Sequence, residues 1–174
     1  VIKKEPIDTK RLFVTGGSGG GVLTAWIVGS TDRFRAAMVQ KPVINWTSHV
    51  LSADNPTFFG PYWFDQLPWE PGAQASYWAH SPLSKVGNVK TPTGVLVGED
   101  DNRTPHTEAE QYYQALQLLH VPTELVLVPG SGHEIATRPT GLIAKVVETL
   151  NWFAKYGGPP LPDAHPSERR SVEP

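Results

Sequence analysis

Residues 11–26 read RLFVTGGSGGGVLTAW and place five glycines around Ser18, between two short apolar runs. The spacing of these glycines excludes two common phosphate-binding loops. A dinucleotide-binding turn needs glycines at its first, third and sixth positions, and the sixth position here is Val22 or Thr24. A P-loop ends in Gly-Lys followed by Ser or Thr, and no lysine follows these glycines. The stretch instead fits G-x-S-x-G, in which a strand turns sharply into a helix with a serine at the apex.

The neighbours of Ser18 suit a nucleophile at such a turn. Gly16 and Gly20 stand two residues before and two after the serine, where side chains would collide in so tight a bend. The N-terminus of the following helix favours negative charge, and the Gly19 amide is in position to donate a hydrogen bond to an oxyanion. The alternative is a glycine-rich connection with an incidental serine, and the pentapeptide alone leaves both interpretations open.

Short apolar runs and helical patterns alternate along the rest of the chain. Apolar runs bounded by Gly, Pro or polar residues predict four buried parallel strands, at residues 11–15, 36–40, 93–98 and 123–129. Thr104 is the predicted N-cap of one helix, followed by Pro105 in its first turn, and apolar residues at helical spacing between Leu142 and Phe153 predict a last helix. This order predicts an α/β fold with a mostly parallel sheet flanked by helices.

Composition narrows the function classes. The chain has 174 residues, enough to bury a core, and its formal net charge of -2 gives no reason to expect nucleic acid or an anionic membrane as partner. The absence of cysteine excludes disulfides, thiol nucleophiles and thiolate zinc sites. No apolar run approaches the roughly 18 residues of a membrane span, and the N-terminal VIKKEPIDTK lacks the apolar core of a signal peptide. We therefore expect a soluble protein, with the cytoplasm favoured.

A serine becomes a strong nucleophile when a base takes its proton and a carboxylate orients that base. In hydrolases built on such a sheet the three residues follow in the order serine, acid, histidine. Glu99, Asp100 and Asp101 follow the third predicted strand, and His133 lies in a glycine-rich loop after the fourth. Because the carboxyl ends of parallel strands share one edge of the sheet, we expect Ser18, one acid and His133 to meet there. The alternatives are a solvated acidic turn and a loop histidine without a partner.

Three segments carry a family resemblance: IDTKRLFVTGGSGGG (7–21), SPLSKVGNVKTPTGVLVGEDDNRTP (81–105) and VPGSGHE (128–134). They resemble the catalytic domain of the prolyl oligopeptidase family of serine peptidases, especially its acylaminoacyl-peptidase and dipeptidyl-peptidase-like bacterial members. The resemblance runs from about Ile7 to about Tyr156 and implies an α/β-hydrolase fold.

The resemblance also implies roles for single residues. In this family the acid is the aspartate three residues after the glycine that ends the strand, and three before a Thr or Val that precedes proline, which selects Asp101. Ser18 and His133 match the nucleophile and the base, with the Gly19 amide as an oxyanion donor. Two positions depart from the family pattern: Gly19 stands where Tyr or Asn is common, and Glu134 follows His133 where glycine is common.

Residues 45–90 form an insert rich in Trp, Tyr, Phe and Pro, for which we expect irregular structure with one or two short helices. Within it, FFGPYWF (58–64) resembles the segment that helps line the substrate side of the family's site. Tyr62, Trp63 and Phe64 are therefore the predicted substrate-binding residues. The alternative is that these aromatic side chains pack in the core and cap.

The resemblance further implies parts that are missing from this sequence, namely a β-propeller and the first half of the hydrolase sheet. We expect a partial catalytic domain over residues 1–157, with about the C-terminal half of the usual sheet, and a disordered tail over 158–174. The second oxyanion donor normally comes from a loop upstream of the nucleophile strand, and losing one such donor typically costs about 100-fold to 1000-fold in rate. The edge of strand 11–15 would need cover from a homo-oligomer or from a missing N-terminal region.

Taken together, these features predict a serine hydrolase that cleaves peptide bonds through an acyl-enzyme and takes a peptide or small acyl substrate. An esterase acting on small acyl esters is one alternative, and a catalytically silent fragment acting as an assembly module is another. No cofactor and no metal are expected, because five further histidines lack metal-ligand spacing: His49, His80, His106, His120 and His165.

Overall fold

Four parallel strands form a sheet within residues 7–157, the part of the chain that this computed structural model describes. Their order across the sheet follows the chain: β1 (Phe13–Gly17), β2 (Ala36–Gln40), β3 (Thr93–Gly98) and β4 (Thr123–Val128). Each connection between parallel neighbours must cross back over a face of the sheet, and helices make these crossings. The predicted α/β fold is confirmed, and β2 and β3 have the bounds that the sequence indicated.

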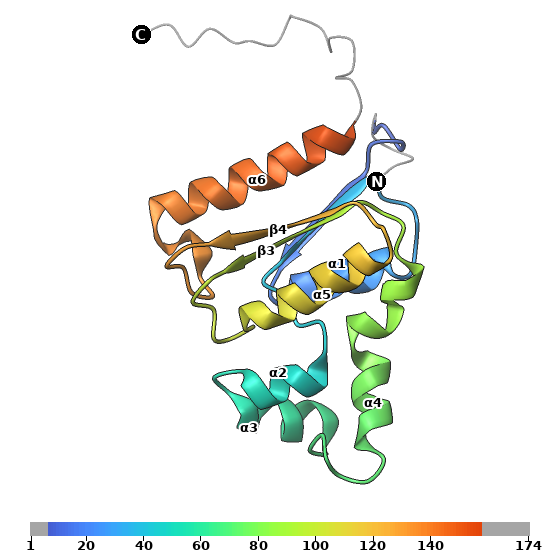
Figure 1. The fold of residues 1–174 in the computed structure, drawn as a ribbon, viewed down its shortest axis with the longest axis vertical. Coiled ribbons are helices and arrows are strands. Elements are labelled where there is room, and N and C mark those ends of the chain that lie inside the picture. The colour runs from blue at the N-terminus through green and yellow to red at the C-terminus, as the bar shows by residue number, and fades with distance from the viewer. Residues whose placement is uncertain (1–6, 158–174) are drawn as a thin grey trace, which may run out of the picture.

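Helices cover both faces of the sheet (Figure 1). α1 (Gly19–Val28) and α5 (His106–Leu118) lie on one face, and α6 (Pro139–Gly157) lies on the other after a short 3-10 turn, η3 (Ile135–Thr137). The insert between β2 and β3 forms a group of short helices beyond α1 and α5: α2 (Trp46–Ser52), α3 (Pro56–Phe59), the π-helical η1 (Gly60–Phe64), α4 (Ala73–His80) and the 3-10 helix η2 (Pro82–Asn88). The insert is thus more helical than its composition predicted.

Alternate residues of the central strands face opposite sides, which gives the sheet two cores. Ala37 and Val39 of β2 pack in a cluster with Tyr112 of α5, whereas Ala36 and Met38 pack in a cluster with Trp152 of α6. Every residue of β2 and β3 is buried, as expected for strands of a parallel sheet covered on both faces.

The buried carboxylate of Glu108, on α5, holds the point where the chain leaves β2 for the insert. It accepts hydrogen bonds from the backbone N–H groups of Ile44 (2.9 Å) and Asn45 (2.8 Å), and from the side chains of Ser48 and Gln111. Burial raises the pKa of Glu108, and these donors oppose that rise. These hydrogen bonds tie the start of the insert to α5, the helix that follows Glu99, Asp100 and Asp101.

The bounds of β1 and α5 differ from the predictions, and β4 ends at Val128, one residue before the predicted Pro129. β1 begins two residues later than expected and continues through Gly17, which pairs with Gln40. A parallel ladder is made by backbone groups alone, so the glycines before the serine do not end it. α5 begins at His106, and the predicted side-chain cap by Thr104 is wrong because its hydroxyl bonds to Asp101 instead.

Helix α6 turns much of its apolar surface away from the sheet. Trp152 is buried, and Phe153 stacks on Phe13 of β1 with ring centroids 4.7 Å apart. The other residues whose spacing predicts this helix are 42% to 61% exposed: Leu142, Ile143, Val146, Val147 and Leu150. β1 lies at an edge of the sheet, and no other strand among residues 7–157 pairs with its outer side.

No helix within residues 7–157 combines the length and apolar character that crossing a lipid bilayer requires. The segment 158–174, for which the sequence predicts disorder, lies outside the described residues. The proposed limits of the catalytic domain stay predictions.

Candidate active site

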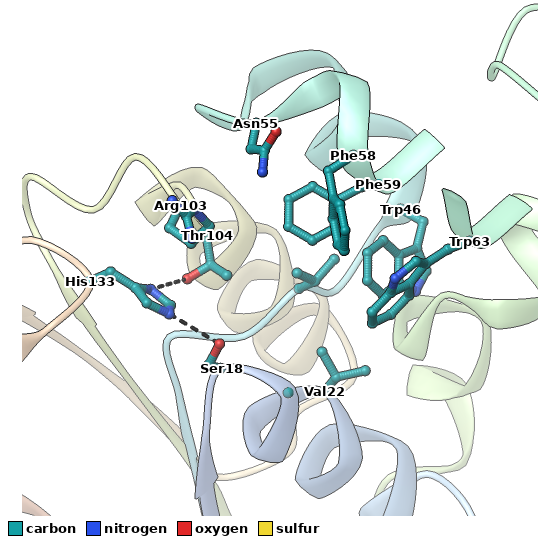
Figure 2. A pocket seen from close by; sticks show the side chains of 12 residues that line it. Ser18, Val22, Trp46, Asn55, Phe58, Phe59, Trp63, Arg103, Thr104 and His133 are labelled. Atoms are coloured by element: carbon teal, nitrogen blue, oxygen red, sulfur yellow. Dashed lines mark hydrogen bonds between the residues drawn. The ribbon is translucent and has the colours of Figure 1, made fainter. Parts of the chain in front are cut away.

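Ser18 lies at the apex of a sharp turn between β1 and α1 (Figure 2). Its backbone has φ 59° and ψ -121°, a conformation that residues other than glycine rarely adopt. Its N–H donates to the Gln40 carbonyl of β2 (3.1 Å), and its own carbonyl accepts from the N–H groups of Gly21 (2.8 Å) and Val22 (3.0 Å). Bonds to both neighbouring elements therefore hold the strained residue, with its side chain at the carboxyl edge of the sheet.

The glycines around Ser18 differ in how much space a side chain would find at each position. A Cβ on Gly16 would lie 2.5 Å from the Gly20 carbonyl oxygen, and one on Gly21 would lie 2.4 Å from the Gln40 carbonyl oxygen. Gly19 and Gly20 have open space where a Cβ would project. The expected collision at Gly20 is therefore wrong. The steric requirement falls on Gly16 and on Gly21, the latter because the first turn of α1 packs directly on the end of β2.

The structure brings Ser18, His133 and Asp101 together at the carboxyl edge of the sheet. His133 Nε2 lies 3.0 Å from Ser18 Oγ, and His133 Nδ1 lies 2.9 Å from Asp101 Oδ2. Figure 2 shows the imidazole ring between the serine and the loop that follows β3. Glu99 and Asp100 are exposed, so of the three candidate acids only Asp101 faces the imidazole. With Nδ1–H donated to the carboxylate, Nε2 is free to accept the serine proton.

Asp101 is almost fully buried and surrounded by donors. Its Oδ1 accepts hydrogen bonds from the backbone N–H groups of Arg103 and Thr104, both at 2.9 Å, and its Oδ2 accepts one from the Thr104 hydroxyl at 3.1 Å. Burial would raise the pKa of this carboxyl, but the hydrogen bonds from His133 and Thr104 outweigh it and hold the pKa below its usual value. The carboxylate is therefore ionised at neutral pH and able to orient the imidazole.

Thr104 is a site residue for which the sequence predicts only a helix cap. Its hydroxyl lies 3.3 Å from His133 Nδ1 and 3.1 Å from the Lys41 carbonyl oxygen, in addition to its contact with Asp101. In the family pattern that selects Asp101, a threonine that precedes proline follows the acid by three residues. The same pattern is the sequence signal that could have revealed the contact between Thr104 and Asp101.

A cavity of about 490 Å³ opens beside Ser18 and His133 (Figure 2). The aromatic part of its wall comes from the insert, two valines outside the insert add aliphatic surface, and polar groups stand near the serine. The lining residues besides Ser18 and His133 are Gly19, Val22, Val43, Trp46, Asn55, Phe58, Phe59, Trp63, Arg103 and Thr104. Such a pocket suits an apolar group attached to a carbonyl that reaches the serine.

The three predicted substrate-binding residues lie in different places. Trp63 lines the cavity beside Ser18. Phe64 stacks on Tyr77, with ring centroids 4.0 Å apart, and lines a neighbouring cavity of about 370 Å³. Tyr62 is 76% exposed and is absent from the walls of both cavities. Phe58 and Phe59 lie in the segment 58–64 that resembles the substrate-side lining, but neither of them, nor Trp46, was among the predicted substrate-binding residues.

The charge of Arg103, at the rim of the cavity, is paired. Its Nε lies 2.6 Å and its Nη2 3.3 Å from the two carboxylate oxygens of Asp54, which follows α2. The Asp54 N–H also donates to the Asn102 carbonyl (2.8 Å). These contacts join the insert to the loop that follows β3. The Asp54 carboxylate also offsets the positive charge of Arg103 at the edge of the cavity.

His49 stands behind the aromatic wall and is fully buried. Its ring lies 4.5 Å from that of Phe59 and 5.3 Å from that of Trp46, between centroids, and neither nitrogen has a partner within the described residues. Burial lowers its pKa to about 4, against the opposing charges of Asp54 and Asp101. The wall is therefore uncharged at neutral pH. Among the described residues, no group of three or more His, Cys, Asp or Glu side chains could hold a metal ion.

Comparisons with known proteins agree with the fold. A family model described as "Prolyl oligopeptidase family" matches residues 1–159. "Uncharacterized peptidase YuxL" of Bacillus subtilis is 39% identical over 156 residues, which cover 89% of this chain and 23% of that protein. The "Acylamino-acid-releasing enzyme" of Homo sapiens is 32% identical over 146 residues, covering 78% of this chain and 19% of that enzyme.

Solved structures give the same result. The uncomplexed acylaminoacyl peptidase of Pyrococcus horikoshii matches with a TM-score of 0.78 and 23% identity, covering 90% of this chain and 26% of that one. This likeness shows the fold. The chain spans 19% to 26% of the length of these three proteins.

The packing of the elbow predicts opposite effects for two neighbouring substitutions. Gly21→Ala forces a Cβ against the Gln40 carbonyl and should lower the free energy of unfolding by about 1 to 3 kcal/mol. Gly20→Ala fills open space in a helix and should leave stability unchanged or raise it by up to about 1 kcal/mol. Urea denaturation followed by tryptophan fluorescence measures both. Equal losses for the two variants would contradict this account of the elbow.

Proposed function

The chain belongs to the prolyl oligopeptidase family, and on this basis we propose that it acts as a serine peptidase through an acyl-enzyme on Ser18. The observation that carries the proposal is the pair of hydrogen bonds made by His133, at 3.0 Å to Ser18 Oγ and 2.9 Å to Asp101 Oδ2. Nucleophile, base and orienting carboxylate stand in the order and geometry that acyl transfer requires.

In the proposed first step Ser18 Oγ attacks the carbonyl carbon of the scissile bond while His133 Nε2 takes the hydroxyl proton. Asp101 accepts Nδ1–H and stabilises the imidazolium. The Gly19 amide, at the first position of α1, donates to the oxyanion, because the first N–H groups of a helix have no partner within it. When the tetrahedral intermediate collapses, the leaving amine takes the proton from His133 and an ester forms on Ser18.

Hydrolysis of the acyl-enzyme repeats these roles with water as nucleophile. His133 takes a proton from the water, the second tetrahedral intermediate forms, and Ser18 Oγ leaves with the proton returned by His133. A second oxyanion donor, and a cover for the outer edge of β1, are proposed to come from protein outside residues 7–157.

The cavity favours substrates with an apolar group on the acyl side of the scissile bond. Its aromatic wall borders the space next to Ser18, and its one guanidinium, on Arg103, is already paired with Asp54. The name of the human relative says that it releases acylamino acids. We propose short peptides whose acyl-side residue is large and apolar.

Substitutions of Ser18 and Asp101 test this function directly. Ser18→Ala removes the nucleophile and should lower kcat/KM for a peptide anilide by about 10⁶-fold at neutral pH. Asp101→Asn leaves the imidazole in the wrong tautomer and should lower it by about 10⁴-fold. Asp100→Asn is the matched control, because this neighbouring acid is exposed, and its activity should stay at the wild-type level. Full activity of Ser18→Ala would rule out the proposed nucleophile.

The specificity proposal predicts different results for two adjacent aromatic residues. Trp63→Ala removes part of the cavity wall and should lower kcat/KM about tenfold for a substrate with an aromatic acyl-side residue, with little change for one with alanine. Tyr62→Ala, outside the cavity, should change neither. The ratio of the two substrates' kcat/KM values is the measurement. An unchanged ratio in Trp63→Ala would mean that the acyl-side group binds elsewhere.

A further inference from the structure

Lys41 contacts all three segments that carry the proposed catalytic residues. It follows β2, the strand between β1 and β3. Its Nζ donates to the His133 carbonyl oxygen at 2.7 Å, and its own carbonyl oxygen lies 3.1 Å from the Thr104 hydroxyl oxygen. Its side chain runs past Gly17, where an added Cβ would come 3.1 Å from Lys41 Cε. Lys41 thus joins the loop that carries His133, the loop that carries Asp101 and Thr104, and strand β1, which precedes Ser18.

Two features make a lysine costly at this position. The side chain is only 12% exposed, although an ammonium is normally left in water. The backbone has φ 38°, in the left-handed region that favours glycine. A glycine here would relieve the backbone strain and leave no charge to bury, so stability alone does not explain the lysine. Strain that persists at such a place points to a role for the side chain.

The loop that carries His133 needs an external contact to keep its position. It connects β4 to η3 and contains two glycines, which restrict the backbone little. One bond holds it at Ser131, whose carbonyl accepts the Asp100 N–H (3.0 Å). Two residues further on, the bond from Lys41 Nζ fixes the His133 carbonyl itself.

We infer that Lys41 is a positioning residue for the base. Its ammonium fixes the His133 backbone so that the imidazole keeps its hydrogen bonds to Ser18 and Asp101. The inference rests on the proposed function. Because Lys41 bonds the carbonyl and not the ring, it takes no proton in the reaction. A displacement of about 1 Å in a catalytic group can lower the rate about 100-fold, so the loss of this bond is measurable.

Kinetics of three variants test the inference. Lys41→Gly suits the backbone and removes the ammonium, so kcat for a small activated ester should fall about 10-fold to 100-fold while KM stays unchanged and the unfolding midpoint does not fall. Lys41→Arg keeps a cationic donor and should recover most of the loss. Glu134→Gln is the matched control: Glu134 lies 3.8 Å from Lys41 Nζ but is 80% exposed, and such a pair contributes little.

A second readout does not depend on turnover. In protein labelled with ¹⁵N-histidine, the His133 ring N–H that bonds to Asp101 should give a resonance protected from exchange with water. We expect this resonance to broaden or vanish in Lys41→Gly and to persist in Lys41→Arg. The other histidines report whether each variant is folded. Lys41→Met, which keeps the aliphatic stem, replaces Lys41→Gly if those signals show that the glycine variant has unfolded.

Three results would overturn the inference: a wild-type kcat in Lys41→Gly, an unchanged His133 resonance in that variant, or an equal loss in Glu134→Gln. The first and third require an active wild-type protein. If the wild type hydrolyses no ester or peptide, the proposed function fails by itself, and the His133 resonance still decides whether Lys41 positions the ring.

Discussion

The two hydrogen bonds of the His133 imidazole set the requirements for the rest of the site. With 3.0 Å on one side and 2.9 Å on the other, Ser18 and Asp101 must stand at opposite nitrogens of one ring, although they lie far apart in the sequence. A parallel sheet meets this requirement by topology, because the carboxyl ends of its strands share an edge. The order β1-β2-β3-β4 delivers each residue to that edge from a different strand.

Topology brings the loops near one another, and local packing sets their final positions. Close backbone contact at Gly16 and Gly21 lets α1 begin directly after Ser18, so the serine is held in its strained conformation from both sides. Burial makes the donors around Asp101 necessary, since an unpaired buried carboxylate would be protonated. The insert that forms the apolar cavity is fixed in turn by Glu108. The contacts that stabilise these loops are therefore the contacts that shape the site.

The sequence predicts best the features whose signal is local. β2 and β3 are recognisable because both faces of each strand are buried, which leaves uninterrupted apolar runs. Glycine spacing and strand order single out Ser18 and His133, whereas the choice of Asp101 among three adjacent acids needed the family resemblance. The contacts of Lys41 leave no local pattern, because they join residues distant in sequence. The spacing within α6 likewise predicts a helix without showing which side meets the sheet.

The most direct test of the central claim is covalent labelling of the purified chain with a fluorophosphonate, read by intact mass beside Ser18→Ala. The account predicts a single phosphonyl adduct on the wild-type protein and none on the variant, because only a serine activated by His133 and Asp101 reacts readily. The absence of an adduct on wild-type protein shown to be folded, or an adduct that persists in Ser18→Ala, would contradict the account.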